Sequence, residues 1–146
     1  AEFGIRHRGS TVPERSGVAL SFCRRPMYAE KIGKHFRSLF PNGQVVQLVD
    51  PAENTDGLYV RYANAAAGNG YVNLYASPTA PSGPGDINTR IIFCGNNSGR
   101  AGEQAQVFLP YPLFIPAGHG IWASSGSFQA GAAPTGGLGL SWDFLG

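Results

Sequence analysis

The stretch Leu138-Gly139-Leu140-Ser141-Trp142-Asp143-Phe144 decides the fold class of this chain. Large apolar residues alternate in it with glycine, serine and aspartate. Successive side chains of a β-strand point to opposite faces of a sheet, so this alternation puts one face in a core and the other outside. The stretch is therefore predicted to be a final strand that faces the core.

The same period of two recurs toward the N-terminus, and turn residues interrupt it about every ten positions, as in proteins built of short strands. Gly68-Asn69-Gly70 is interpreted as a hairpin loop, and residues 77–88, with three prolines, as a longer loop. The other expected strands are 17–23, 44–49, 58–62, 70–76, 89–94, 104–109, 113–115 and 120–124.

Glycine and proline are abundant, with 21 and 11 of the 146 residues, while 42% of the chain is hydrophobic. A chain near this length buries roughly two thirds of its unfolded surface. Many short strands with few crossover helices favour an all-β fold, an antiparallel β-sandwich of jelly-roll-like form. We expect an extended N-terminal arm at residues 1–16 and a single β-sandwich domain at residues 17–146.

One segment has a helical pattern. Tyr28, Ile32, Phe36, Leu39 and Phe40 recur at spacings that place them on one side of a helix. Gly33 disfavours a helix at its centre, and Pro41-Asn42-Gly43 would end it. The pattern predicts one short helix over about residues 27–40.

Charge is unevenly distributed along the chain. Residues 1–37 hold eight basic and three acidic side chains, and the remainder holds three basic and six acidic ones. A basic arm can bind nucleic acid, but dense Lys/Arg blocks are missing here, so nucleic acid is not an expected partner. Arg6, Arg8 and Arg15 are candidate interface residues for acidic patches on a neighbouring subunit; a solvated tail is the alternative.

The residues that usually carry catalysis or bind metals are scattered. His7, His35 and His119 have no ligand spacing, and Cys23 and Cys94 form no CxxC motif. The two thiols are expected to be buried and free in strands, with a disulfide as the alternative. We therefore expect no enzyme activity, no catalytic residue, no metal and no cofactor. No apolar run is long enough to cross a membrane, and the first residues lack a secretory pattern, so a soluble protein is expected.

Aromatic residues offer another function, because exposed rings can stack on sugars. Trp122 and Trp142 lie at positions expected to be buried, so most rings are expected in a core or an interface. A carbohydrate-binding β-sandwich module used in host attachment remains the alternative function, with a glycan as its ligand.

The segment 110–116 contains Pro110, Pro112 and Pro116, which cannot donate to a β-ladder. It is expected to be an edge strand or a sheet-crossing bend. Tyr111, Pro112 and Phe114 are the further candidate interface residues, since a partner can add at an edge. Packing within the monomer is the alternative.

Four stretches within about residues 70–125 form a series of strands and turns: Val72–Thr79, Asn88–Ile92, Ala101–Leu109 and Pro112–Ser124. The series resembles small β-sandwich proteins of tailed bacteriophage virions. In that group a VxLY-type strand, a Ser/Pro-rich loop, an AGE turn and a strand-turn-strand built on L-x-I-x-AG-x-x-I-x-A recur. Phe93-Cys94-Gly95-Asn96-Asn97 departs from the pattern, as does the basic segment in front.

The resemblance implies a non-enzymatic virion structural protein, a capsid-decoration, head-fibre or tail-adaptor subunit. Its expected partners are other capsid or tail proteins and copies of itself in a homo-oligomer. Its expected location is the virion, after synthesis in the host cytoplasm. An arm that becomes ordered on a neighbouring subunit would add contact area during assembly.

Overall fold

The computed structural model describes residues 31–97 and 105–146, and in these ranges all regular structure is β-strand. Every strand pairing is antiparallel, so the all-β antiparallel part of the fold prediction is confirmed. The expected strands within 44–49, 89–94, 104–109, 113–115, 120–124 and 138–144 are present, some with longer bounds. The strands are β1 His35–Leu39, β2 Val45–Val49, β3 Leu58–Ser77, β4 Ile91–Asn97, β5 Ala105–Phe108, β6 Leu113–Ile115, β7 Gly120–Gly126 and β8 Thr135–Phe144.

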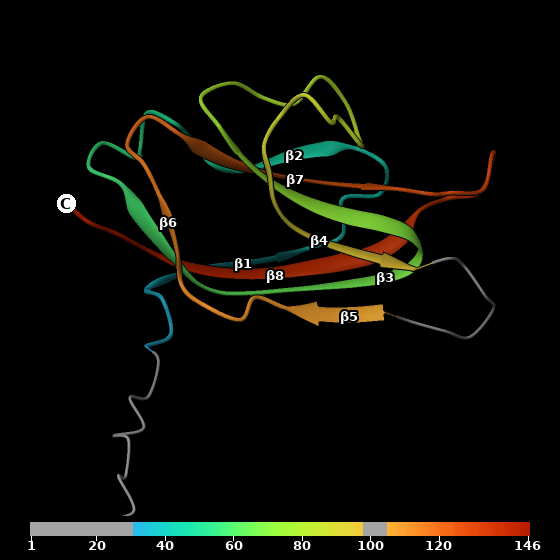
Figure 1. Ribbon diagram of the computed structural model, residues 1–146, viewed down its shortest axis with the longest axis horizontal. Coiled ribbons are helices and arrows are strands. Elements are labelled where there is room, and N and C mark those ends of the chain that lie inside the picture. Colours follow the sequence, from blue (N-terminus) through green and yellow to red (C-terminus); the bar gives the residue numbers. More distant parts are fainter. Residues whose placement is uncertain (1–30, 98–104) are drawn as a thin grey trace, which may run out of the picture.

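The strands form one curled sheet in the order β1-β8-β3-β7-β2, with β4, β5 and β6 also paired to β3. The sheet folds over so that two parts of it face each other (Figure 1). We call β1, β8, β5, β6 and residues 58–69 of β3 the β8 half. The β7 half consists of β2, β7, β4 and residues 70–77 of β3.

The long strand β3 connects the two halves. Its first part pairs with β8 up to Asn69, and its second part pairs with β7 from Tyr71 onward. Gly70 lies at the junction with a φ of 108°, a conformation that L side chains rarely adopt. The expected hairpin loop at residues 68–70 is therefore wrong: these residues bend one continuous strand instead of reversing it, because each part finds its own partner strand.

The predicted helix is also wrong over its described part, residues 31–40; residues 27–30 lie outside the described ranges. Residues 35–39 form β1, in which Phe36 pairs with Ser141 and Leu39 with Leu138 of β8. Gly33 crosses the β8 backbone so closely that a Cβ would lie 2.7 Å from the Trp142 carbonyl carbon. Pairing with a strand a hundred residues away overrides the local helical spacing.

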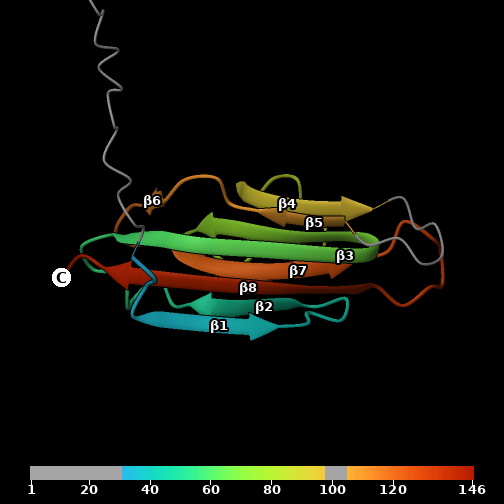
Figure 2. The same cartoon turned by 90° about the horizontal axis from the view of Figure 1, so that it is seen from below.

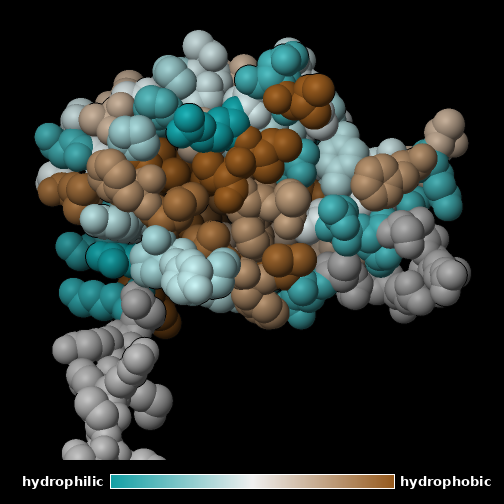
Figure 3. Space-filling model, viewed as in Figure 1, coloured by the Kyte–Doolittle hydropathy of each residue, from teal (hydrophilic) through white to brown (hydrophobic). Residues whose placement is uncertain are grey.

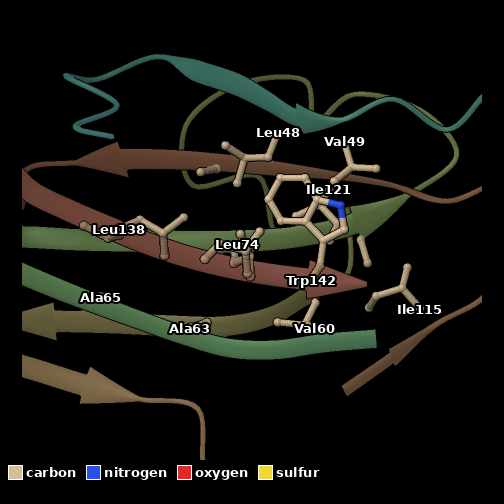
Figure 4. Close-up of a cluster of buried hydrophobic side chains, with 14 of the residues drawn as sticks. Leu48, Val49, Val60, Ala63, Ala65, Leu74, Ile115, Ile121, Leu138 and Trp142 are labelled. Atoms are coloured by element: carbon tan, nitrogen blue, oxygen red, sulfur yellow. The ribbon is translucent and has the colours of Figure 1, made fainter. Parts of the chain in front are cut away.

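The core lies between the two halves and takes side chains from both (Figure 4). Leu138, Leu140 and Trp142 of β8 are at most 7% exposed, which confirms that the final strand faces the core. They pack in one cluster with Leu74 of β3 and Ile121 of β7. Each fully buried side chain of this size contributes roughly 1.5–3 kcal/mol.

A buried asparagine joins two loops at one end of the sheet. Asn54, in the β2–β3 loop, donates from Nδ2 to the carbonyl oxygens of Pro116 and His119, both at 2.8 Å. The Gly118 N–H in turn donates to the Asn54 carbonyl. Asn54 is fully buried, so it fixes the β6–β7 turn against the β2–β3 loop.

The loop at residues 78–90 is organised by one carboxylate. Asp86 accepts hydrogen bonds from the Ser82 N–H at 2.9 Å, the Asn88 N–H at 2.8 Å and the Thr89 hydroxyl at 2.9 Å. The backbone bonds from Ser82 and Asn88, followed by the bond from Thr89, hold the pKa of Asp86 well below its usual range. Asp86 therefore closes the turns of this loop, as aspartate commonly does beside glycine.

The depressed pKa of Asp86 predicts an acid-sensitive loop. A carboxylate with a lowered folded-state pKa stabilises above its unfolded pKa, near 4, and loses that contribution as pH falls toward the folded value. We expect Asp86→Asn to speed amide exchange at Ser82 and Asn88 at pH 7 and to remove the loop's acid sensitivity below pH 4. Exchange measured by NMR at both pH values checks this, with Asp56→Asn, the same change at an exposed aspartate of the β2–β3 loop, as control. Equal exchange in the parent and the Asp86→Asn variant at pH 7 would contradict it.

Cys94 is a free and exposed thiol on β4, so the expectation that it is buried is wrong. It pairs with Asn73 of β3, which lies on the side of the sheet away from the core, on a strand with a single partner among the described residues. Cys23 lies outside the described residues.

Candidate subunit interface

The outer faces of the two halves differ in how they are covered. On the β7 half, Tyr75 and Trp122 pair across strands and point away from the core residues Leu74 and Ala123. Both are nevertheless at most 4% exposed. The loop at residues 78–90 lies over this face (Figure 1), with Gly85 against the Tyr71 hydroxyl. The chain thus covers the outer face of the β7 half itself.

The outer face of the β8 half presents exposed aromatic rings. Figure 2 looks onto this half, where β1, β8, β3 and β5 lie side by side. Phe36 and Tyr62 both pair with Ser141, from opposite sides, and so lie in one row across three strands. The Tyr62 ring lies 6.3 Å from that of Phe108. We call this surface the aromatic face; its rings, between 44% and 77% exposed, are Phe36, Phe40, Tyr62, Phe108 and Phe114.

Two adjoining hollows run along β8 on the aromatic face. The larger, of about 490 Å³, lies between Phe36 of β1 and Tyr62 of β3. The smaller, of about 240 Å³, extends toward Phe40. Both are lined by Ser38, Asn64 and Gly139, so they form one continuous depression, which we call the β8 groove.

The sequence of β8 explains why the groove exists. Its outward positions are Gly137, Gly139 and Ser141, which have little or no side chain. A Cβ at Gly137 would lie 2.8 Å from the Phe40 ring, and one at Gly139 would meet the Asn64 amide. The glycines therefore let neighbouring side chains lie flat across β8, as aromatic rings do over strand glycines.

The described chain begins on this same face. After Lys31 and Ile32, which line the larger hollow, Gly33 crosses β8 at Trp142. The Lys34 N–H then donates to Asp143 Oδ1 at 2.7 Å before β1 starts. The first described residues therefore lie at the β8 groove.

The carboxylate at the rim of the groove is paired. Arg61 Nε donates to Asp143 Oδ2 at 3.0 Å, and the Arg61 guanidinium carbon lies 5.2 Å from the centre of the Tyr59 ring. The hydrogen bond from the Lys34 N–H, helped by Arg61, lowers the pKa of Asp143. The aromatic face is therefore mainly apolar, with its acidic group already neutralised by a partner.

The interface residues expected in the segment 110–116 lie beside this surface. Phe114, on β6, is half exposed and packs against Tyr59 at 5.5 Å between ring centres, while Tyr111, before β6, is 76% exposed. Pro112 is half-buried. Since β5 and β6 both pair with β3 alone among the described strands, the segment is at a sheet edge, as expected.

Apolar surface continues from Phe114 onto the side of the molecule where β4 and β6 face each other. Figure 3 shows hydrophobic side chains gathered there. A hollow of about 200 Å³, lined by Ile92, Leu113, Phe114 and His119 among others, opens on this side. Phe114 is thus shared by two neighbouring apolar surfaces.

Sequence reasoning missed Phe36, Phe40 and Phe108 as interface candidates. In a strand, Phe36, Ser38 and Phe40 share one face, but the helical spacing was followed instead. The other expected interface residues, Arg6, Arg8 and Arg15, lie outside the described residues. Trp122 and Trp142 are buried, as their strand positions predict, and so present no sugar platform.

No family model, curated protein or solved structure matches this chain. The part of the chain that the structure describes holds no group of three or more His, Cys, Asp or Glu side chains placed to bind a metal ion. Among the same residues there is no helix of the length and apolarity that crossing a membrane requires.

Proposed function

We propose that this chain is a non-enzymatic structural subunit of a virion, of the capsid-decoration, head-fibre or tail-adaptor kind. It works through contacts with copies of itself and with other capsid or tail proteins, and it resides in the virion after synthesis in the host cytoplasm. The virion assignment rests on the resemblance of residues 70–125 to phage structural proteins. The assembly role rests on the aromatic face.

The strand order supports the finer fold assignment that accompanies this proposal. The β8 half runs β1-β8-β3 and continues to β5 and β6, and the β7 half runs β2-β7-β3-β4. Because β5 and β6 pair with different parts of β3, they share one position beside it, and each layer then has four positions. This order supports a jelly-roll sandwich, a frequent form in viral capsid domains.

The contrast between the two outer faces is the observation that carries the assembly role. A protein that covers Tyr75 and Trp122 with its own loop leaves Phe36 and Tyr62 exposed, with an apolar groove between them. Exposed apolar patches rimmed by polar groups mark interaction sites. Among the described residues, the carboxylate of this face, Asp143, is already paired with Arg61. A second copy with the same apolar face therefore suits it better than a basic partner.

The proposal predicts that the aromatic face holds an oligomer together. Replacing a central interface ring costs about 2 kcal/mol or more, which is roughly a 30-fold rise in the dissociation constant. We expect Phe36→Ser with Tyr62→Ser to convert an oligomer into monomers at micromolar concentration, measured by light scattering. Ile87→Ser is the matched control, because Ile87 is 87% exposed but lies on the loop over the other half.

If the double variant folds and keeps the mass of the parent oligomer, the aromatic face is not the interface. Circular dichroism and thermal unfolding separate this result from misfolding, since both substituted side chains are exposed. A parent chain that is monomeric and does not bind capsid or tail shells would overturn the assembly role as a whole.

A further inference from the structure

The β8 groove has the shape of a site for an extended polypeptide. Its floor positions Gly137, Gly139 and Ser141 repeat every second residue, which corresponds to about 6.7 Å along a strand. Ser141 is 4% exposed, lines the larger hollow, and its Oγ has no hydrogen-bond partner among the described residues. A hydroxyl of this kind, buried without a partner, is costly unless something bound above it supplies one.

One segment of this chain has the matching pattern. Residues 17–23 read Gly-Val-Ala-Leu-Ser-Phe-Cys, without a charge, and Val18, Leu20 and Phe22 fall on every second position. In an extended conformation these three side chains share one face at the same spacing of about 6.7 Å. The segment could therefore set three apolar side chains along the groove while one of its backbone carbonyls accepts the hydrogen bond that the Ser141 hydroxyl donates.

The position of Lys31, the first described residue, brings the segment 17–23 within reach of a groove. Lys31 lies at the groove, and residues 24–30 can span at most about 25 Å. Two sheets that pack face to face are about 10 Å apart. When two copies meet through their aromatic faces, the segment 17–23 of each can therefore reach the groove of the other.

We propose that residues 17–23 of one copy lie extended in the β8 groove of a neighbouring copy, so that the subunits are joined by exchanged N-terminal segments. This inference rests on the proposed function, because it names what occupies the interface. The outer faces of both halves are then covered. The chain's own loop covers the β7 half, and the segment of a neighbouring copy covers the β8 half.

The test uses the full-length chain and its own thiols. One form keeps Cys23 and carries Cys94→Ser. The other carries Cys23→Ser, Cys94→Ser and Ser38→Cys, together with a tag that changes its size. Ser38 is exposed and lines both hollows of the groove. In the control form the new thiol is placed by Thr79→Cys, exposed on the loop at residues 78–90.

We expect mild oxidation of the mixture to give a disulfide-linked pair of unlike chains at least tenfold faster with Ser38→Cys than with Thr79→Cys. Adding Leu20→Asp to the Cys23 form should reduce the rate to that of the control. Equal rates at the two positions would overturn the inference. So would a chain that carries both Cys23 and Ser38→Cys and closes the disulfide only within itself.

The mass in solution separates this inference from the proposed function. If Phe36→Ser with Tyr62→Ser dissociates the oligomer while Leu20→Asp leaves both mass and cross-linking unchanged, the exchanged segment is wrong and the aromatic interface stands. If the parent chain is itself a monomer that binds no capsid or tail shell, both fail.

Discussion

Gly70→Ala is expected to lower the melting temperature by roughly 12–20 °C, on the basis of about 4 kcal/mol lost and 3–5 °C per kcal/mol for a chain of this size. Two costs add at this position. A residue with a side chain at a φ of 108° is strained by about 1–3 kcal/mol. Its Cβ would also collide with the Gly126 carbonyl oxygen and lie 2.7 Å from the Ser127 Cα, and backbone atoms of a paired strand cannot move aside cheaply.

Two other glycines separate these costs. Gly118 has a φ of 72° but nothing within 4 Å of its Cβ position, so Gly118→Ala should show the strain alone. Gly83 has open space and no such φ, and Gly83→Ala should change stability by less than about 0.5 kcal/mol. Thermal unfolding followed by circular dichroism gives the three values. If Gly70→Ala lowers the melting temperature no more than Gly118→Ala does, the bend of β3 does not depend on the close approach to β7.

The strands were predictable wherever one face of a segment is buried. Leu138, Leu140 and Trp142 alternate with small residues, and the alternation itself records which side meets the core. The segments 45–49 and 120–124 were identified instead as short apolar runs between turn residues. In β8 the structural information is local, because a period of two has only one solution that buries the large side chains.

The two errors in secondary structure, the hairpin loop and the helix, arose where pairing between distant segments decides the structure. Residues 68–70 look like a hairpin because glycine favours turns, yet β3 continues since Asn69 pairs with β8 and Tyr71 with β7. The helical spacing of Ile32, Phe36 and Phe40 is real, but these side chains are exposed on a segment that pairs with β8. Neither partner strand is close in sequence, so local periodicity could not reveal it.

For the same reason, only part of the candidate interface could be predicted from the sequence. Phe114 was identified because prolines mark an edge, which is a local property. Phe36 and Tyr62 become neighbours only when β1 and β3 lie on either side of Ser141. The groove exists only because β8 has glycine at positions 137 and 139, where a side chain would fill the space. The glycines of β8 therefore have a use beyond turns: they shape the surface that the proposed assembly needs.

Asn54→Asp is expected to destabilise the chain strongly, because Asn54 is fully buried and its amide joins two loops. The Asn54 amide nitrogen donates to two carbonyl oxygens, and its Oδ1 has no partner among the described residues. Asn54→Ala removes the donor to the His119 carbonyl and leaves the Pro116 carbonyl with only the longer bond from the His119 N–H at 3.3 Å, at a cost of about 2–3 kcal/mol. A carboxylate at the same place would also be buried and would repel both oxygens, so Asn54→Asp should cost more than Asn54→Ala at pH 7.

This prediction has a pH dependence whose sign follows from the site. Burial and two facing carbonyls disfavour the charged carboxylate, so the folded-state pKa of the carboxyl introduced by Asn54→Asp would lie above its unfolded value, near 3.9. The destabilisation is then complete above the folded pKa and is relieved as pH falls, because a protonated carboxyl can donate to one carbonyl. Urea unfolding at pH 7 and pH 4 should therefore show Asn54→Asp recovering stability relative to Asn54→Ala at the lower pH.

Asn42→Asp makes the same chemical change in an exposed turn with a φ of 52°, where the effect should stay within about 0.5 kcal/mol. An Asn54→Asp variant as stable as the parent at pH 7 would mean that the β6–β7 turn, and the Phe114 edge attached to it, is held in place by other contacts.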